Sequence, residues 1–195
     1  LRRLILTLGL WIGLWGAAVT AAPPPFHEQV FLTPQGALTQ IFGKELQTQS
    51  QNISLTDSQK EVVEKRLGWI SSPKPITVYT VRRNRQLLGY ALVVDEIGKY
   101  HPITFMVAIT PELTVKGAVV LVYREEVGAE IRKPRFLNQF LGKRPQDPLV
   151  MGRDLTAISG ATLSSWAAAA GIKRALILTE VLIHAHLLPV AGETP

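Results

Sequence analysis

The sequence contains no cysteine among its 195 residues. Disulfide bonds, zinc sites with thiolate ligands, iron–sulfur clusters and haem attachment through a C-x-x-C-H motif are therefore excluded. A redox protein with this sequence has to use an organic cofactor, or one that other residue types ligate. The absence of cysteine is compatible with an oxidising compartment outside the cytoplasm but does not establish one.

Acidic residues are in the minority, because 15 Asp and Glu stand against 21 Lys and Arg, for a formal net charge of +6. Such an excess can indicate binding to nucleic acid or to an anionic membrane surface. Here the basic residues are scattered along the chain in pairs and triplets, and no aromatic residues are interleaved with them. We expect a solvated basic surface that can face anionic lipid headgroups, and no binding of nucleic acid.

The N-terminal part of the chain is the only long apolar run. Residues 4–22 are almost entirely apolar and are long enough to span the hydrocarbon core of a membrane as a helix. Arg2 and Arg3 favour a cytoplasmic N-terminus, and the prolines at 23–25 predict a stiff, extended exit. The alternative is a signal peptide cleaved near residues 19–21. We expect that this segment stays on the protein, as a single-span anchor (or uncleaved signal) in the inner (cytoplasmic) membrane.

We divide the chain into this anchor and its exit at 1–25, an extracytoplasmic (periplasmic) domain at 26–188 and a tail at 189–195. Residues 26–70 have a helical pattern, in which Thr33-Pro34 and the capping box Thr56–Gln59 each start a helix. β-Branched and aromatic runs then predict four strands, at 76–82, 87–94, 103–109 and 115–123. Four strands joined by short turns form an antiparallel meander that needs helices to cover it, so the fold class is α+β.

Three carboxylates, Glu125, Glu126 and Glu130, follow the last predicted strand. They could serve acid–base or metal chemistry, but basic residues lie beside them, so a surface ion-pair patch is the stronger expectation. The histidines at 184 and 186 are two residues apart and point to different sides of a helix, which makes them a poor metal pair. Because no nucleophile–base arrangement is visible either, we predict no catalytic residue and no metal site.

Residues 154–165 organise the rest of the domain. They predict a short buried strand, a tight turn of small residues with several hydroxyl groups, and a helix that continues through Trp166 and four alanines to residue 188. A helix N-terminus carries unpaired N–H groups and the positive end of the helix dipole, so this turn can hold a phosphate. The alternative is that the serine and threonine side chains simply cap the helix. These residues alone leave both interpretations open.

The turn resembles the flavinylation motif of the FMN-binding domain family, and the matching residues are Ser159, Gly160, Ala161, Thr162, Leu163 and Ser164. That family includes the C subunit of the sodium-pumping quinone reductase, the G subunit of the Rnf complex and a domain of nitrous-oxide-reductase regulators. The resemblance implies that Thr162 carries FMN through a phosphoester made by a flavin transferase that uses FAD and magnesium. Asp154 takes the place of the acidic residue that leads into the motif.

The resemblance covers roughly residues 28–175 and includes the loop at 123–131. It implies flavin contacts from Glu125, Glu126 and Gly128, with the isoalloxazine ring lying flat on Leu163 and the alanine run. The loop departs from the Rnf and quinone-reductase pattern, which has threonine and proline there, and looks closer to stand-alone extracytoplasmic flavoproteins.

The sequence therefore predicts a membrane-anchored extracytoplasmic flavoprotein that relays electrons through FMN on Thr162 and is not a stand-alone catalyst. Its expected partners are the other subunits of a membrane redox complex, the flavin transferase during maturation, and the lipid bilayer. One alternative is an accessory or assembly subunit that keeps the FMN-binding fold. Another is a secreted soluble enzyme that binds FMN without a covalent bond.

Overall fold

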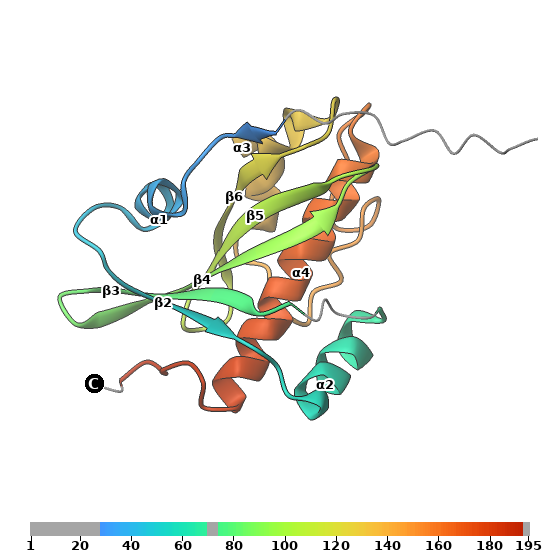
Figure 1. The fold of residues 1–195 in the computed structure, drawn as a ribbon. Coiled ribbons are helices and arrows are strands. Elements are labelled where there is room, and N and C mark those ends of the chain that lie inside the picture. Colours follow the sequence, from blue (N-terminus) through green and yellow to red (C-terminus); the bar gives the residue numbers. More distant parts are fainter. Residues whose placement is uncertain (1–27, 70–73, 193–195) are drawn as a thin grey trace, which may run out of the picture.

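A six-stranded antiparallel sheet organises the chain (Figure 1). The computed structural model describes residues 28–69 and 74–192. The strands lie in the order β1-β6-β5-β4-β3-β2. Their bounds are β1 Gln29–Val30, β2 Gln47–Ile53, β3 Ile76–Arg83, β4 Gln86–Ile97, β5 Pro102–Ile109 and β6 Val115–Tyr123.

Three longer helices and three short helical segments accompany the sheet. Their bounds are α1 Pro34–Phe42, α2 Asp57–Leu67, η1 Ala129–Arg132, α3 Pro134–Leu137, η2 Asn138–Phe140 and α4 Thr162–His184. The predicted starts of the first two are confirmed, since Thr33 accepts a hydrogen bond from the Gly36 amide and Thr56 forms a complete capping box with Gln59. These hydroxyl caps satisfy amides that a helix start otherwise leaves unpaired.

The sheet separates two hydrophobic cores. Phe105, Val107 and Ile109 of β5 face the larger core, which α4 covers, whereas Met106 and Ala108 face the smaller core beneath α1. Because successive side chains of a strand point to opposite faces, both faces of β5 are buried, which explains its continuous apolar sequence. The predicted α+β class and the meander of β3 to β6 are confirmed.

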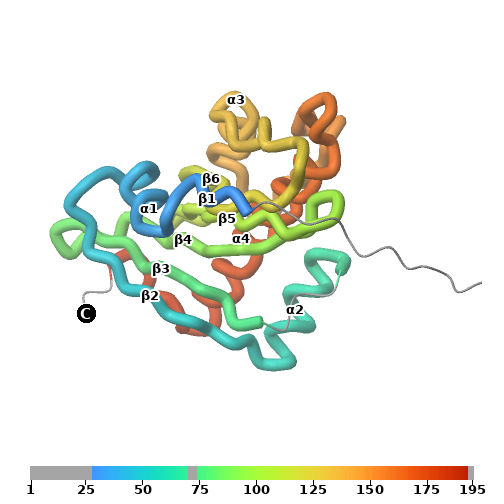
Figure 2. Tube along the Cα trace, turned by 45° about the horizontal axis from the view of Figure 1, so that its top comes forward, coloured from blue at the N-terminus to red at the C-terminus, as the bar shows by residue number. Residues whose placement is uncertain are grey.

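α4 is held along its length by neighbouring elements. It crosses one face of the sheet, and α2 lies beside its C-terminal half (Figures 1 and 2), where Arg66 pairs with Glu180. Glycine at 171 allows the close approach to the sheet, because a Cβ there would lie 3.0 Å from Glu96 Cγ and 3.3 Å from Val94 Cγ2. Arg174, one turn further on, pairs with Glu96 at 3.0 Å.

Three predictions of secondary structure were wrong in part. The helical pattern assigned to residues 26–70 does not hold for Gln47–Ile53, which forms β2 at the edge of the sheet and pairs with β3. Its sequence, QTQSQNI, lacks apolar alternation because β2 is largely exposed, so no pattern could indicate a strand. The buried strand predicted before the turn is only an isolated bridge between Met151 and Leu155, and α4 ends at His184, not at residue 188.

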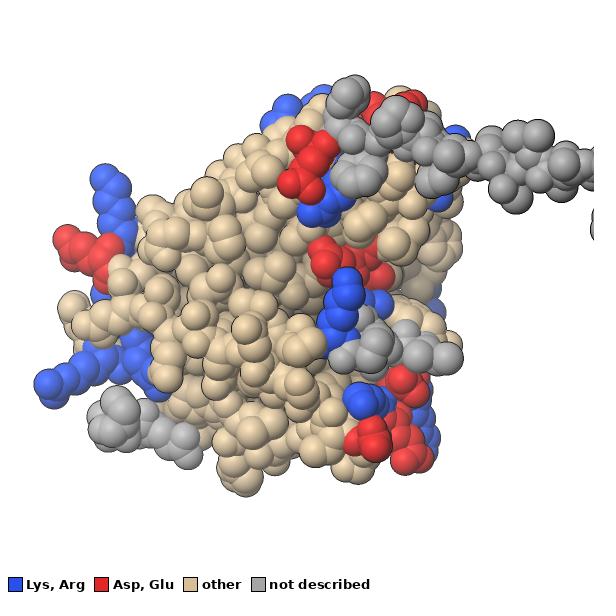
Figure 3. Space-filling model, viewed as in Figure 1, with Lys and Arg blue, Asp and Glu red and all other residues tan. Residues whose placement is uncertain are grey.

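Charged side chains stand mainly around the margins of the face seen in Figure 3, where both signs occur and the middle is largely uncharged. Within the described ranges, 28–69 and 74–192, no helix combines the length and apolarity needed to cross a membrane. The predicted anchor at residues 4–22 lies outside those ranges.

Candidate functional site

The turn that precedes α4 is a tight hydrogen-bonded β-turn. The Ala161 amide donates to the Ile158 carbonyl at 3.0 Å, and Gly160, the third residue of the turn, has a φ of +80°. A type II turn requires this positive φ, which glycine adopts without steric penalty. Nothing lies within 4 Å of the place where a Cβ would stand on Gly160, so its conformation, and not the available space, calls for glycine.

No side chain caps the N-terminus of α4. Ala161 occupies the N-cap position, and no side-chain hydrogen bond caps this helix. The alternative in which the hydroxyls of the motif serve as plain caps is therefore not what the structure shows. Amides in the first turn of α4 remain available to a negatively charged group, and the helix dipole favours such a group.

The turn is held by hydrogen bonds on the side of the protein interior and is exposed to solvent on its outer side. Ser165 is fully buried; its hydroxyl accepts from the Ile158 amide at 3.1 Å and donates to the Ala161 carbonyl at 2.9 Å. Ser159, Gly160, Thr162 and Leu163 are all exposed. Thr162 is thus a solvent-accessible hydroxyl on a braced turn, as attachment of a cofactor by an external enzyme requires.

The loop after β6 packs directly against this turn. A Cβ on Gly128 would lie 2.7 Å from Ser164 Oγ, 2.8 Å from Tyr123 Oη and 3.4 Å from the Ala161 Cβ. Gly128 also has a φ of +97°, so both space and conformation require glycine there. The structure brings together Gly128, Ala161 and Ser164, which the resemblance had assigned to one site.

Tyr123 joins the two segments and was not predicted as a site residue. It is only 1% exposed, and its hydroxyl donates to the Val127 carbonyl at 2.6 Å and lies 3.0 Å from Ser164 Oγ. Because the phenol proton goes to Val127, the Ser164 hydroxyl is the donor to Tyr123. Burial raises the pKa of the phenol, against the lowering effect of this bond from Ser164. A tyrosine at the junction of a strand and a glycine loop was the only signal in the sequence.

The predicted acidic residues of the loop have different surroundings. Glu125 is 7% exposed, and its Oε1 accepts from the amides of Tyr100, at 2.6 Å, and His101, at 3.0 Å, so it fastens the β4–β5 hairpin. Glu126 is exposed. Among the described residues, no ion pair within 4.0 Å joins these carboxylates to the neighbouring basic residues: Arg124 pairs with Glu28, and Arg132 lies over the Phe31 ring. The expected ion-pair patch is therefore wrong.

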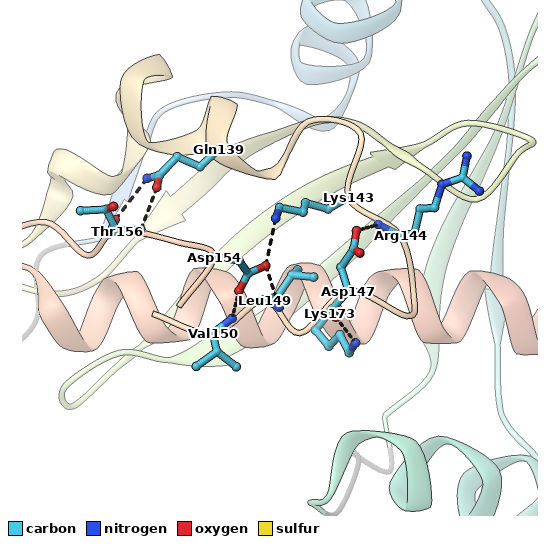
Figure 4. Close-up of polar contacts among 9 residues, drawn as sticks. All are labelled: Gln139, Lys143, Arg144, Asp147, Leu149, Val150, Asp154, Thr156 and Lys173. Atoms are coloured by element: carbon cyan, nitrogen blue, oxygen red, sulfur yellow. Dashed lines mark hydrogen bonds and ion pairs between the residues drawn. The ribbon is translucent and has the colours of Figure 1, made fainter. Parts of the chain in front are cut away.

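Asp154 fixes the loop that leads into the turn (Figure 4). Its carboxylate pairs with Lys143 at 2.9 Å and accepts from the amides of Val150, at 2.8 Å, and Leu149, at 3.3 Å. Burial opposes ionisation, but the hydrogen bonds from Lys143 and from the two amides outweigh it and hold the pKa of Asp154 below its usual value. The motif's acidic residue is therefore an ionised brace in this chain.

A second brace holds the strand-like segment just before the turn. The Gln139 amide accepts from the Thr156 N–H at 2.8 Å and donates to the Thr156 carbonyl at 3.1 Å (Figure 4). This pair of bonds replaces the ladder partner that a true strand would have. It connects η2 with the chain that enters the motif.

A cavity of about 550 Å³ opens beside these residues. Its walls come from the segment between η1 and η2 and from the three residues before Ser159: Glu130, Lys133, Arg135, Phe136, Gln139, Thr156, Ala157 and Ile158. The volume lies within the usual range for small-molecule sites, and apolar walls with a few polar groups are typical of them.

Three of the four alanines at 167–170 are buried and offer no surface to a ligand. Ala168 is fully buried, and Ala167 and Ala169 are each 5% exposed, because they pack into the main core. Ala170, the fourth alanine, is half-buried, so a contact of a flat ring with the run stays a prediction for that residue alone. Leu163, by contrast, is 52% exposed. In the part of the chain that the structure describes, no group of three or more His, Asp or Glu side chains could hold a metal ion.

Comparison with known proteins gives a match to one family model and to two crystal structures. Two crystal structures are similar at low identity. One is NqrC of Shewanella oneidensis (17% identity, 76% of this chain and 89% of that chain, TM-score 0.49). The other is the C subunit of the Na⁺-translocating NADH-quinone reductase from Parabacteroides distasonis (17% identity, 75% of this chain and 83% of that chain, TM-score 0.46). No curated protein matches the sequence. The model of the FMN-binding domain matches residues 98–177, a range that includes the Gly128 loop, Asp154 and the whole turn. Residues 98–177 of this chain are therefore similar to the FMN-binding domain family.

Proposed function

We propose that this protein is a flavoprotein that relays electrons through FMN attached by a phosphoester to Thr162. The observation that carries the proposal is the position of Thr162: an exposed hydroxyl at the first residue of a helix that no side chain caps. That helix begins within the matched FMN-binding domain.

The residues around Thr162 suit a phosphodiester. Joining FMN to the hydroxyl leaves one negative charge on the phosphate, close to the free amides and the positive dipole end of α4. In the transfer from FAD, the threonine oxygen replaces AMP on the flavin phosphate and gives up its proton. Gly128, Tyr123 and Ser164 hold the turn in place from behind, through the contacts described above.

The cavity beside the turn is the proposed place of the isoalloxazine ring. Phe136 and Ile158 offer apolar surface, while Lys133 and Arg135 bring positive charge to its edge. Positive charge near the ring stabilises the negative charge that reduction adds, which raises the flavin potential. Contacts of the flavin with Leu163, Glu126 and Gly128 stay predictions, and so does any direct contact with Glu125, whose Oε1 already binds the hairpin.

The flavin supplies the redox chemistry when bound, and the chain supplies its attachment and surroundings. We further propose that residues 4–22 anchor the domain on the outer side of the inner membrane, within or beside a redox complex. Covalent attachment fits such a place, because a flavin that dissociated outside the cytoplasm would be lost. Other subunits of that complex would then deliver and remove electrons.

The test is to produce the full chain together with a flavin transferase, denature it, and measure flavin fluorescence on the polypeptide and its intact mass. We expect a mass increase of one FMN less one water in the wild type, and neither signal in Thr162→Ala. Thr48→Ala is the matched control, because Thr48 is also exposed but lies on the edge strand β2, away from the cavity and the turn. It should keep both signals.

The outcomes separate the alternatives. Flavin that copurifies but is released on denaturation would support non-covalent binding and contradict the linkage to Thr162. A chain without any flavin would contradict electron relay and favour the accessory subunit that only keeps the fold.

A further inference from the structure

Large apolar side chains are exposed at the end of the domain that carries Thr162. We call five of them the apolar rim: Ile97 (64% exposed), Tyr100 (61%), Val127 (66%), Leu163 (52%) and Trp166 (52%). They come from the β4–β5 hairpin, the loop after β6 and the first turns of α4. Exposed apolar side chains that cluster in this way mark a surface that is covered in use.

The three segments of the rim are joined by hydrogen bonds and so form one surface. Glu125, two residues before Val127, accepts from the hairpin amides of Tyr100 and His101. On the other side, Tyr123 bonds both the Val127 carbonyl and Ser164 of α4. The hairpin, the loop and the start of α4 accordingly lie at the same end of the molecule (Figures 1 and 2).

The chain also enters the domain at this end. Glu28, the first described residue, pairs with Arg124 at 2.8 Å, and Arg124 donates to the Pro102 carbonyl at the base of the hairpin at 3.1 Å. β1 then pairs with the end of β6, where Gln29 lies opposite Tyr123. The point at which the preceding segment joins the domain is therefore next to the apolar rim.

The length of the preceding segment limits how far this end can lie from a membrane. Only residues 23–27 stand between the predicted span and Glu28, and an extended chain of that length reaches no more than about 18 Å. The turn at the opposite end of the 12-residue β4 is about 40 Å away from the hairpin. The rim is thus at the membrane-proximal end.

We propose that the apolar rim rests on the lipid bilayer and holds the Thr162 turn at the membrane surface. Tryptophan and tyrosine prefer the interface between headgroups and acyl chains, where one part of the ring is apolar and another is wet. Lys99 lies over the Tyr100 ring, 4.7 Å from its centroid, and adds a positive charge that anionic headgroups attract. The proposal rests on the anchor of the proposed function but not on the flavin.

The test uses the absence of cysteine from the chain. Single cysteines are introduced into the full-length protein at two rim positions, Ile97→Cys and Tyr100→Cys, and at two exposed positions at the far end, Glu112→Cys and Gln86→Cys. Each variant is labelled with a fluorophore and reconstituted in phosphatidylcholine–phosphatidylglycerol vesicles that carry nitroxide-labelled acyl chains. We expect several-fold stronger quenching at the two rim positions than at the two distal ones.

Equal quenching at both ends, or none at either, would overturn the proposal. Shielding of the rim labels that appears only after other protein subunits are added would assign the surface to a protein and would likewise overturn it. The same measurement on Thr162→Ala separates this proposal from the proposed function: unchanged quenching without flavin supports the rim, and loss of quenching contradicts it.

Discussion

Gly128→Ala tests whether the loop after β6 supports the turn that precedes α4. Two separate costs follow from the geometry. The φ of +97° is unfavourable for an L-residue with a Cβ, which costs about 1–2 kcal/mol. The new Cβ would also lie 2.7 Å from Ser164 Oγ and 2.8 Å from Tyr123 Oη, and overpacking of this kind costs about 1–3 kcal/mol. Neither neighbour can easily move away, because both are buried and hydrogen-bonded.

Gly152→Ala is the matched control. Gly152 has a similar φ of +83°, but nothing lies within 4 Å of its notional Cβ, so only the conformational cost applies. We expect the free energy of unfolding to fall further in Gly128→Ala than in Gly152→Ala, by about 1–3 kcal/mol. For a domain of this size, each kcal/mol lowers the melting temperature by about 2–4 °C.

The assay is thermal and denaturant unfolding of the full chain in detergent, followed by circular dichroism. Ser164→Ala in the Gly128→Ala background removes one of the two contacting oxygens and should restore part of the loss. Equal destabilisation by the two glycine variants would refute the argument that Gly128 is packed against the turn.

Two further predictions concern carboxylates. Glu125→Ala leaves the hairpin amides of Tyr100 and His101 without their acceptor, which costs about 1–3 kcal/mol for each amide that stays buried. Hydrogen exchange at these two amides should accelerate, whereas Glu126→Ala should leave their exchange unchanged. Equal exchange in both variants would contradict the role of Glu125 in holding the hairpin. Burial raises the pKa of Glu96 from 4.5 to about 7 although the Arg174 guanidinium opposes this shift. The folded state therefore holds the Glu96 proton more tightly than the unfolded chain does. The free energy of unfolding accordingly falls as the pH rises from 4.5 to about 7. Glu96→Gln should flatten this pH dependence, and curves that stay parallel to the wild type would disprove it.

Elements with strong local patterns could be predicted from the sequence. β3 to β6 follow from β-branched and aromatic runs, and α1 and α2 start at the predicted threonine caps. β2 could not be predicted, because an exposed edge strand of glutamine, threonine, serine and asparagine has no apolar period to detect.

The candidate site was predictable where it is continuous in sequence, and not where it depends on packing. The turn at Gly160 follows from its residues, and its closeness to Gly128 followed from the family resemblance. The bond between Tyr123 and Ser164 spans 41 positions and depends on how α4 lies on the sheet. The cavity likewise arises where two distant segments meet, and the burial of the alanine run is set by the core it faces.

The polar edge strand β2 suggests the order in which the domain comes apart. β2 contributes little to either core and is held by its pairing with β3 and a few polar contacts, including Thr77 to Asn52. Gln51 of this strand also donates to the Leu187 carbonyl of the C-terminal segment, at 3.2 Å. β2 should therefore detach first, in a local opening that leaves β3 to β6 and α4 intact. The C-terminal segment should stay in place, because Leu188 is buried in the larger core and Tyr90 of β4 donates a hydrogen bond to the Pro189 carbonyl. Proteases would cut first within β2, on the side of the sheet away from β1 and the Thr162 turn.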